Sequence, residues 1–140
     1  MRVAVHLILF RDNDVLLLRR ANSPWRNGWY SVIAGHVDGN ETIAHAMVRE
    51  ALEEGGLTVQ ESDMRFVHVL HRISKDSEYI DYFFIPEKYS GEPKNMEPDK
   101  CDDLSWFPLD QLPENTIPYI RQAIERIRAG VAFSEFDEQK

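Results

Sequence analysis

Residues 35–57, from which the fold can be argued, read GHVDGNETIAHAMVREALEEGGL. The second half of this stretch predicts a helix, because its apolar residues share one side when the chain is placed at roughly 100° per residue. Glu50, Glu53 and Glu54 fill an arc largely away from that side. The pattern therefore predicts three carboxylates on one small patch of a helix.

Such a cluster of like charges needs an explanation, since like charges three and four residues apart destabilise a helix. One interpretation is an acidic face that is simply solvated. The other is a bound divalent cation, because carboxylate oxygens are the ligands that Mg²⁺ prefers, and Mg²⁺ commonly bridges carboxylates and substrate phosphates. The second interpretation indicates phosphate chemistry.

The residues around the cluster favour the second interpretation. Gly35 is followed after five residues by Glu41 and, after seven more, by residues 49–57, REALEEGGL. This spacing resembles the signature box of the Nudix hydrolases at every fixed position. The resemblance implies an α/β/α sandwich with a mixed β-sheet between helices. It also implies metal-dependent hydrolysis of a phosphoanhydride in a nucleoside diphosphate linked to some group X.

The resemblance also assigns roles within the box. Glu50 and Glu54 are the first-choice metal ligands, and Glu53 is a third ligand or a supporting group. The backbone carbonyl of Ala34 or Gly35 often joins the metal shell in relatives. For the general base the expectation is Glu53, with Glu50 as the alternative. The expected cofactor is Mg²⁺, and Mn²⁺ is a common substitute.

The remaining box residues are expected to shape the site. Arg49 would orient a box glutamate through charge-assisted hydrogen bonds, with an ordinary surface arginine as the alternative. Glu41 would organise the loop before the helix. Thr42 is expected to cap a helix that starts at Ile43, and the glycine pair 55–56 to end it.

Upstream of the box, the apolar runs 3–10 and 15–20 predict a hairpin of two strands buried on both faces. Residues 29–34 predict a strand that leads into the box and places Gly35 at its exit. Arg19 and Arg20 end the second run, and Arg26 lies in the polar loop 21–28. These three arginines are candidates for binding substrate phosphates, although a solvated strand edge explains them equally well.

Downstream, residues 65–73 and 79–86 predict a second hairpin, and residues 87–103 form a long polar loop. Several MutT-type relatives bring a further carboxylate to the metals from such a position. Glu97 is the first choice here, with Asp99 and Asp102 behind it. The alternative is a solvated acidic loop.

The last part of the chain predicts a short strand over 104–108 and an amphipathic helix from about 117 to 127. Residues 133–140 are expected to be a frayed tail. The expectation is therefore one domain over 1–132.

Composition narrows the classes of partner. A net charge of −8 argues against binding of bulk DNA or RNA, which draws on clustered Lys and Arg. The apolar start is too short to span a membrane, and the single cysteine, Cys101, excludes an internal disulfide and fits a reducing compartment. We therefore expect a cytoplasmic monomer or homodimer whose partner is a small nucleotide.

Substrate choice depends on residues outside the box. The strand that ends in residues 106–109, WFPL, looks like that of nucleoside triphosphate pyrophosphohydrolases. Hydrolysis of a triphosphate to monophosphate and pyrophosphate is therefore the leading expectation. ADP-ribose or dinucleoside polyphosphate pyrophosphatases are the alternatives. A Nudix-fold regulator that binds nucleotide without cleaving it is a further alternative, disfavoured by the complete box.

Overall fold

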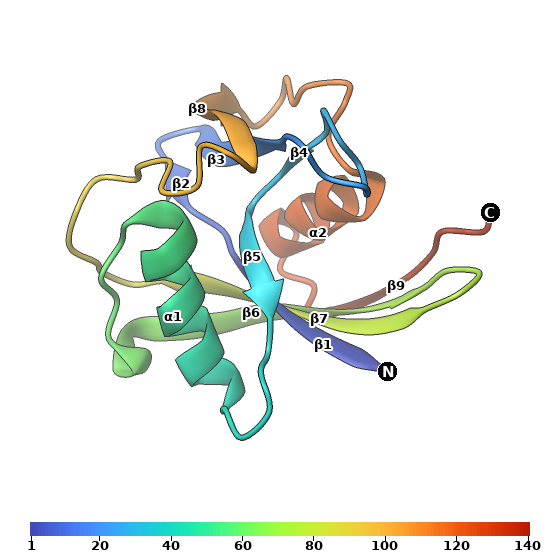
Figure 1. Cartoon of the computed structure of the whole chain (residues 1–140), viewed down its shortest axis with the longest axis horizontal. Helices are drawn as coiled ribbons and strands as arrows, with labels where there is room; N and C mark the ends of the chain where they lie inside the picture. Colours follow the sequence, from blue (N-terminus) through green and yellow to red (C-terminus); the bar gives the residue numbers. More distant parts are fainter.

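The computed structural model describes residues 1–140 and places two helices on either side of a strand framework (Figure 1). The larger sheet consists, in spatial order, of β5 (Ile33–His36), β1 (Arg2–Leu7), β7 (Glu78–Pro86), β6 (Met64–Ile73) and β9 (Phe133–Asp137). In the smaller sheet, β3 (Asp14–Arg20) pairs with β2 (Phe10–Arg11), β4 (Tyr30–Ser31) and β8 (Cys101–Pro108). The helices are α1 (Ile43–Gly55), α2 (Pro118–Arg128) and a short 3-10 turn, η1 (Glu61–Asp63).

The larger sheet is mixed, because β1 runs parallel to β7 and β6 parallel to β9, whereas its other pairs are antiparallel. All pairs of the smaller sheet are antiparallel. The expected class, helices around a mixed sheet, is thus confirmed, with the strands divided between two sheets. Neither helix is long and apolar enough to cross a membrane.

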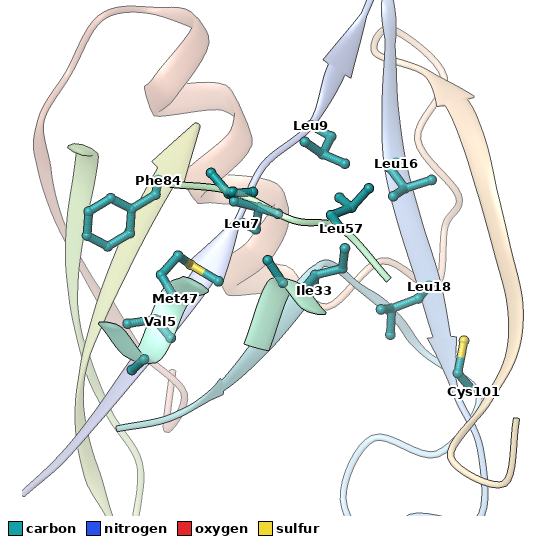
Figure 2. Close-up of a cluster of buried hydrophobic side chains, with 13 residues drawn as sticks. Val5, Leu7, Leu9, Leu16, Leu18, Ile33, Met47, Leu57, Phe84 and Cys101 are labelled. Atoms are coloured by element: carbon teal, nitrogen blue, oxygen red, sulfur yellow. The ribbon is translucent and has the colours of Figure 1, made fainter. Parts of the chain in front are cut away.

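Two hydrophobic cores explain why the N-terminal strands are apolar on both faces. Along β3, Leu16 and Leu18 enter the core under α1, whereas Val15 and Leu17 enter the core under α2. Successive residues of a strand point to opposite faces, so each core receives every second side chain. Figure 2 shows the first core, where Met47 of α1 packs among side chains from several strands.

The predicted first hairpin is wrong in its extent. The run 3–10 is divided: β1 belongs to the larger sheet, and only the two residues of β2 pair with β3. The chain passes from one sheet to the other at Ile8 and Leu9, which are buried in different cores. A segment that crosses between two cores is apolar throughout, and its pattern cannot be distinguished from one continuous strand.

The strand predicted over 29–34 is divided in the same way. β4 pairs with β3 in the smaller sheet, and β5 pairs with β1 in the larger one. Gly35 consequently lies inside β5, paired with Val5, and not at the exit of a strand. The β6–β7 hairpin is confirmed, and the Ser74 N–H closes its turn by donating to the Ser77 carbonyl at 2.8 Å.

The prediction of a frayed tail is also wrong. Residues of β9 pair in parallel with β6, from Val69 opposite Phe133 to Ile73 opposite Asp137. Ser134 Oγ lies 2.8 Å from Nε2 of the buried His68. The tail has no continuous apolar pattern, and its partner strand lies far away in sequence, so local periodicity gives no sign of the pairing.

Candidate active site

The box helix begins and ends as its sequence predicts. Thr42 caps α1, and its Oγ1 accepts a hydrogen bond from the His45 N–H at 3.2 Å. At the other end Gly56 has φ 70°, a left-handed conformation that favours glycine, and its N–H donates to the Leu52 carbonyl at 3.0 Å. These two caps fix the length of the helix that carries the glutamates.

Arg49 connects the loop before α1 to the carboxylates on the helix. Its Nε and Nη2 donate to the two carboxylate oxygens of Glu41 at 2.7 and 3.0 Å. Its Nη1 donates to Glu50 at 2.6 Å and to Glu53 at 3.1 Å, and Nη2 also donates to the His36 carbonyl at 3.1 Å. One guanidinium therefore orients three glutamates, with the planar geometry that lysine lacks.

Glu41 is the loop carboxylate in this network. The hydrogen bonds from Arg49 and from the Asp38 N–H lower its pKa to about 2. It therefore remains a charged acceptor that organises the loop.

Glu54 occupies a more buried position. One of its oxygens accepts a hydrogen bond from the Ala34 N–H of β5 at 3.0 Å. Burial, together with the negative charges of Glu50 and Glu97, raises the pKa of Glu54 to about 8. Burial also raises the pKa of Glu50, against the opposing effect of Arg49. Half-buried carboxylates that repel one another in this way are stabilised in their charged forms by a cation.

The chemistry of these donors fits a divalent metal ion. Glu50 packs directly against Gly35, Glu54 is held by Ala34, and Glu97 is close enough to raise the pKa of both glutamates. Oxygen ligands of this kind suit Mg²⁺ or Mn²⁺. The structure itself contains no group of three or more His, Cys, Asp or Glu residues arranged to hold a metal ion.

The segment from the end of β7 into β8 carries the three candidate acids and brings one of them, Glu97, to the cleft. Its backbone is attached to the end of α1, because the Lys94 N–H donates to the Gly55 carbonyl at 2.9 Å. Asn95 Oδ1 accepts from the Glu97 N–H at 3.1 Å, while its Nδ2 donates to the Cys101 carbonyl at 2.8 Å. Asn95 thus holds the turn that presents Glu97.

The other two acids, Asp99 in the loop and Asp102 in β8, have different surroundings. Asp102 accepts a hydrogen bond from Arg19 Nε at 2.7 Å, and the Asp99 carbonyl accepts one from Asn22. Glu97 lines the large cleft of the molecule, whereas Asp99 and Asp102 do not. Of the three, Glu97 has the placement that a site carboxylate needs.

The three candidate arginines are separated by the fold. Arg20 lines the cleft and holds the loop after β3, donating to the Trp25 carbonyl at 3.0 Å and to Ser23 Oγ at 2.8 Å. Arg19, the preceding residue in the strand, makes its ion pair with Asp102. Arg26 lies over the Trp29 ring at 4.7 Å. Neither Arg19 nor Arg26 lines the cleft.

The cleft has a volume of about 840 Å³ and extends well beyond the box. At the box end it is lined by Ala34, Gly35, Glu54 and Glu97. Residues that the sequence analysis did not assign to a site line the rest, among them Arg72, Tyr79, Tyr119 and Glu138. A cleft of this size is in the range of small-molecule sites.

Arg72 is the main charged group in the part of the cleft beyond the box. It donates to both oxygens of Asp81, at 2.9 and 3.2 Å, and its guanidinium lies 4.2 Å from the Tyr79 ring and 4.0 Å from the Tyr119 ring. A sequence signal for it exists, since Arg72 and Asp81 are opposite charges inside two apolar runs of one hairpin. For Glu138 there is no comparable signal.

Comparison with known proteins identifies the family. Residues 1–127 match the model of the NUDIX domain. An ADP-ribose pyrophosphatase of Methanocaldococcus jannaschii is 32% identical over 112 residues, which cover 80% of this chain and 64% of the relative. An NAD-capped RNA hydrolase, NudC, of Pectobacterium carotovorum is 32% identical over 108 residues, which cover 77% of this chain and 39% of the relative. The chain thus spans less than two thirds of the length of these curated relatives.

Solved structures agree in fold. A MutT NUDIX hydrolase from Burkholderia pseudomallei superposes with a TM-score of 0.80 at 30% identity, covering 89% of this chain and 95% of that one. A MutT protein from Bacillus halodurans has a TM-score of 0.79 at 20% identity and covers 98% of this chain and 90% of its own, which supports the fold alone. With the domain match over residues 1–127 and the complete box on α1, this chain belongs to the Nudix hydrolase family.

Proposed function

We propose that this protein is a metal-dependent pyrophosphohydrolase that cleaves a phosphoanhydride in a nucleoside diphosphate linked to a group X. The observation that carries the proposal is the network in which Arg49 orients Glu50 and Glu53. Beside it, the half-buried Glu54 and the loop residue Glu97 line one end of the cleft. A structural helix has no need of this concentration of negative charge.

In this proposal Mg²⁺, or Mn²⁺ in its place, would be held by Glu50 and Glu54, with Glu97 as a further ligand and Glu53 as a third ligand or a supporting group. A backbone carbonyl of Ala34 or Gly35 completes the set. When bound, the ion supplies neutralisation of the phosphate oxygens and a lower pKa for an attacking water. These ligands are carried by a capped helix, a paired strand and a loop attached to that helix, which limits their movement.

The remaining work falls to residues of the chain. Glu53 is the proposed general base, because its side chain is 56% exposed and Arg49 fixes it in one orientation. Glu50 is the alternative, although it is only 14% exposed. Arg20 lines the cleft and is the proposed cationic contact for substrate phosphates.

We propose two classes of substrate, one supported by the sequence and one by the comparisons. A nucleoside triphosphate, cleaved to monophosphate and pyrophosphate, is the first candidate because of the strand that ends in WFPL. ADP-ribose is the second candidate, supported by the name of the archaeal relative at 32% identity. The cleft volume of about 840 Å³ accommodates either, and its extension to Arg72 leaves room for a second group beyond the diphosphate.

Product analysis tests the proposal. The purified protein is incubated with Mg²⁺ and a panel of nucleoside triphosphates, ADP-ribose and diadenosine polyphosphates, with a chelator in the control samples. Pyrophosphate and a monophosphate as products select the triphosphate class, whereas AMP and ribose 5-phosphate select ADP-ribose. Absence of turnover with both Mg²⁺ and Mn²⁺, combined with retention of nucleotide, would contradict the proposal and indicate a binding protein.

A further inference from the structure

The C-terminal segment contributes a side chain to the cleft. Glu138 follows β9 and lies beyond residues 1–127, the part that matches the family. Its N–H donates to the Ile73 carbonyl at 2.8 Å, and its side chain, 15% exposed, lines the cleft. The Gln122 side chain donates to the Glu135 carbonyl at 3.0 Å, which attaches β9 to α2. The backbone of Glu138 is therefore attached to β6, and the strand before it is attached to α2.

One carboxylate oxygen of Glu138 has no hydrogen-bond donor. Oε1 is buried and unpartnered. Its neighbouring cation is Arg72, whose Nη1 is 3.8 Å away, an ion-pair separation that is too long for a hydrogen bond. The Nε and Nη2 donors of Arg72 are already directed at Asp81. A buried acceptor without a donor is unusual in a native protein. The Glu138 side chain lines the cleft, so a ligand there can supply the donor once the carboxylate turns toward it.

Aromatic side chains line the same cleft and lie close to Arg72, the cation beside this oxygen. The Arg72 guanidinium lies over the rings of Tyr79 and Tyr119, and the Trp25 ring is 5.8 Å from it. All four residues line the cleft with Glu138. Flat apolar surfaces with one placed acceptor suit an aromatic heterocycle that carries an N–H donor.

We propose that Glu138 is a specificity-determining residue that accepts a hydrogen bond from an amino group of a flat heterocycle bound at the Arg72 end of the cleft. The inference rests on the proposed function, because it makes this heterocycle part of the nucleotide substrate. The N–H donor has two chemical sources: the amino group of a nucleobase or the carboxamide of a nicotinamide. Both present an N–H in the plane of a ring.

Binding measured without metal tests this assignment separately from hydrolysis. AMP is compared with purine riboside 5′-monophosphate, which lacks only the amino group, by calorimetry in the presence of a chelator. A second pair, nicotinamide mononucleotide and nicotinic acid mononucleotide, replaces the amide N–H by a carboxylate. For the unmodified protein we expect the amino or amide member of one pair to bind about tenfold more tightly or better, as for a hydrogen bond to a charged group.

The variants are Glu138→Ala, Glu138→Gln and, as a matched control, Glu135→Ala in the exposed part of β9. Glu138→Ala should abolish the discrimination, Glu138→Gln should retain part of it, and Glu135→Ala should leave it unchanged. Thermal unfolding verifies the fold, and the Gln variant serves if the Ala variant is unstable.

Three outcomes would overturn the assignment: equal binding of both members of each pair, no binding of any of the four, or discrimination that persists without the Glu138 carboxylate. If hydrolysis is found but discrimination is not, only this inference fails. If discrimination is found without hydrolysis, only the proposed function fails.

Discussion

The carboxylate of Glu50 occupies the space that a side chain at residue 35 would need. A Cβ on Gly35 would lie 2.1 Å from Glu50 Cδ and 2.5 Å from each of its oxygens. Strand β5 and the box helix can therefore approach only because residue 35 is glycine. The atoms in conflict are the end of a flexible side chain, so a methyl group there should displace the carboxylate and leave the backbone in place.

Gly35→Ala is accordingly expected to weaken Mn²⁺ binding about tenfold or more, since it moves a proposed ligand, while thermal unfolding changes little. Electron paramagnetic resonance of free Mn²⁺ measures the affinity. Gly39→Ala is the matched control, because no atom lies within 4 Å of a Cβ at that position. Unchanged Mn²⁺ affinity in Gly35→Ala would contradict the proposed role of Glu50.

Arg49→Lys tests the orienting network. Lysine keeps the charge but cannot contact both oxygens of Glu41 while also reaching Glu50 and Glu53. We expect turnover to fall about tenfold or more and the free energy of unfolding to fall by about 1–3 kcal/mol, because hydrogen bonds to charged groups are lost. Denaturant titration and steady-state kinetics provide the measurements.

The control for this change is Arg65→Lys, at an exposed position of β6. Equal turnover of Arg49→Lys and Arg65→Lys would show that the network does not position the catalytic carboxylates.

Asn95→Ala tests whether the loop presents Glu97 to the metal site. Without the bonds to the Glu97 N–H and the Cys101 carbonyl, the turn should relax. Mn²⁺ affinity is expected to fall about as much as in Glu97→Ala, and the double variant should show no further loss, as for residues that act as a unit. Glu92→Ala, an exposed change in the same loop, is the control. Fully additive losses in the double variant would show that Asn95 acts independently of Glu97.

His6 predicts a pH dependence of stability. Its ring is buried and stacked on Phe83 at 4.4 Å, and burial lowers its pKa from 6.5 to about 4. The folded protein therefore keeps His6 neutral, whereas the unfolded chain takes up a proton below about pH 6.5. The free energy of unfolding should fall as the pH decreases from 6.5 towards 4, by at most about 1.4 kcal/mol per pH unit from this residue.

The measurement is a series of denaturant titrations between pH 7 and 5, made on the unmodified protein and on His6→Gln. The variant should be less stable overall but should show a smaller loss of stability on acidification. Identical slopes for the two proteins would mean that His6 is not the buried neutral group described above.

The parts of the structure that the sequence predicts are those set by local contacts. Thr42 and Gly56 delimit α1 through hydrogen bonds to residues three and four positions away, and the β6–β7 hairpin closes over a short turn. The spacing within α1 likewise places Glu50, Glu53 and Glu54 on one surface. Residues 35–57 were therefore sufficient to predict the helix that carries these three glutamates.

The parts that were missed depend on contacts between distant segments. No local turn connects β1 to β7 or β6 to β9, so nothing in the nearby sequence predicts that these strands pair in parallel. The apolar runs 3–10 and 29–34 are each divided into two strands at the point where the chain passes from one sheet to the other. That Arg20 lines the cleft and Arg19 does not could be seen only once the strands paired with β3 on both of its edges were known. Glu138 reaches the cleft only because β9 adds to the sheet edge.

The central claim, that the carboxylates of α1 catalyse metal-dependent hydrolysis, is tested most directly by the turnover of Glu53→Gln and Glu54→Gln with Mg²⁺. Glutamine preserves the shape of each side chain and removes its charge. We expect each variant to fold and to lose about a hundredfold or more in turnover of whichever substrate the unmodified protein cleaves. Near-normal turnover in either variant would contradict the role assigned to that residue, and near-normal turnover in both would contradict the account of the site.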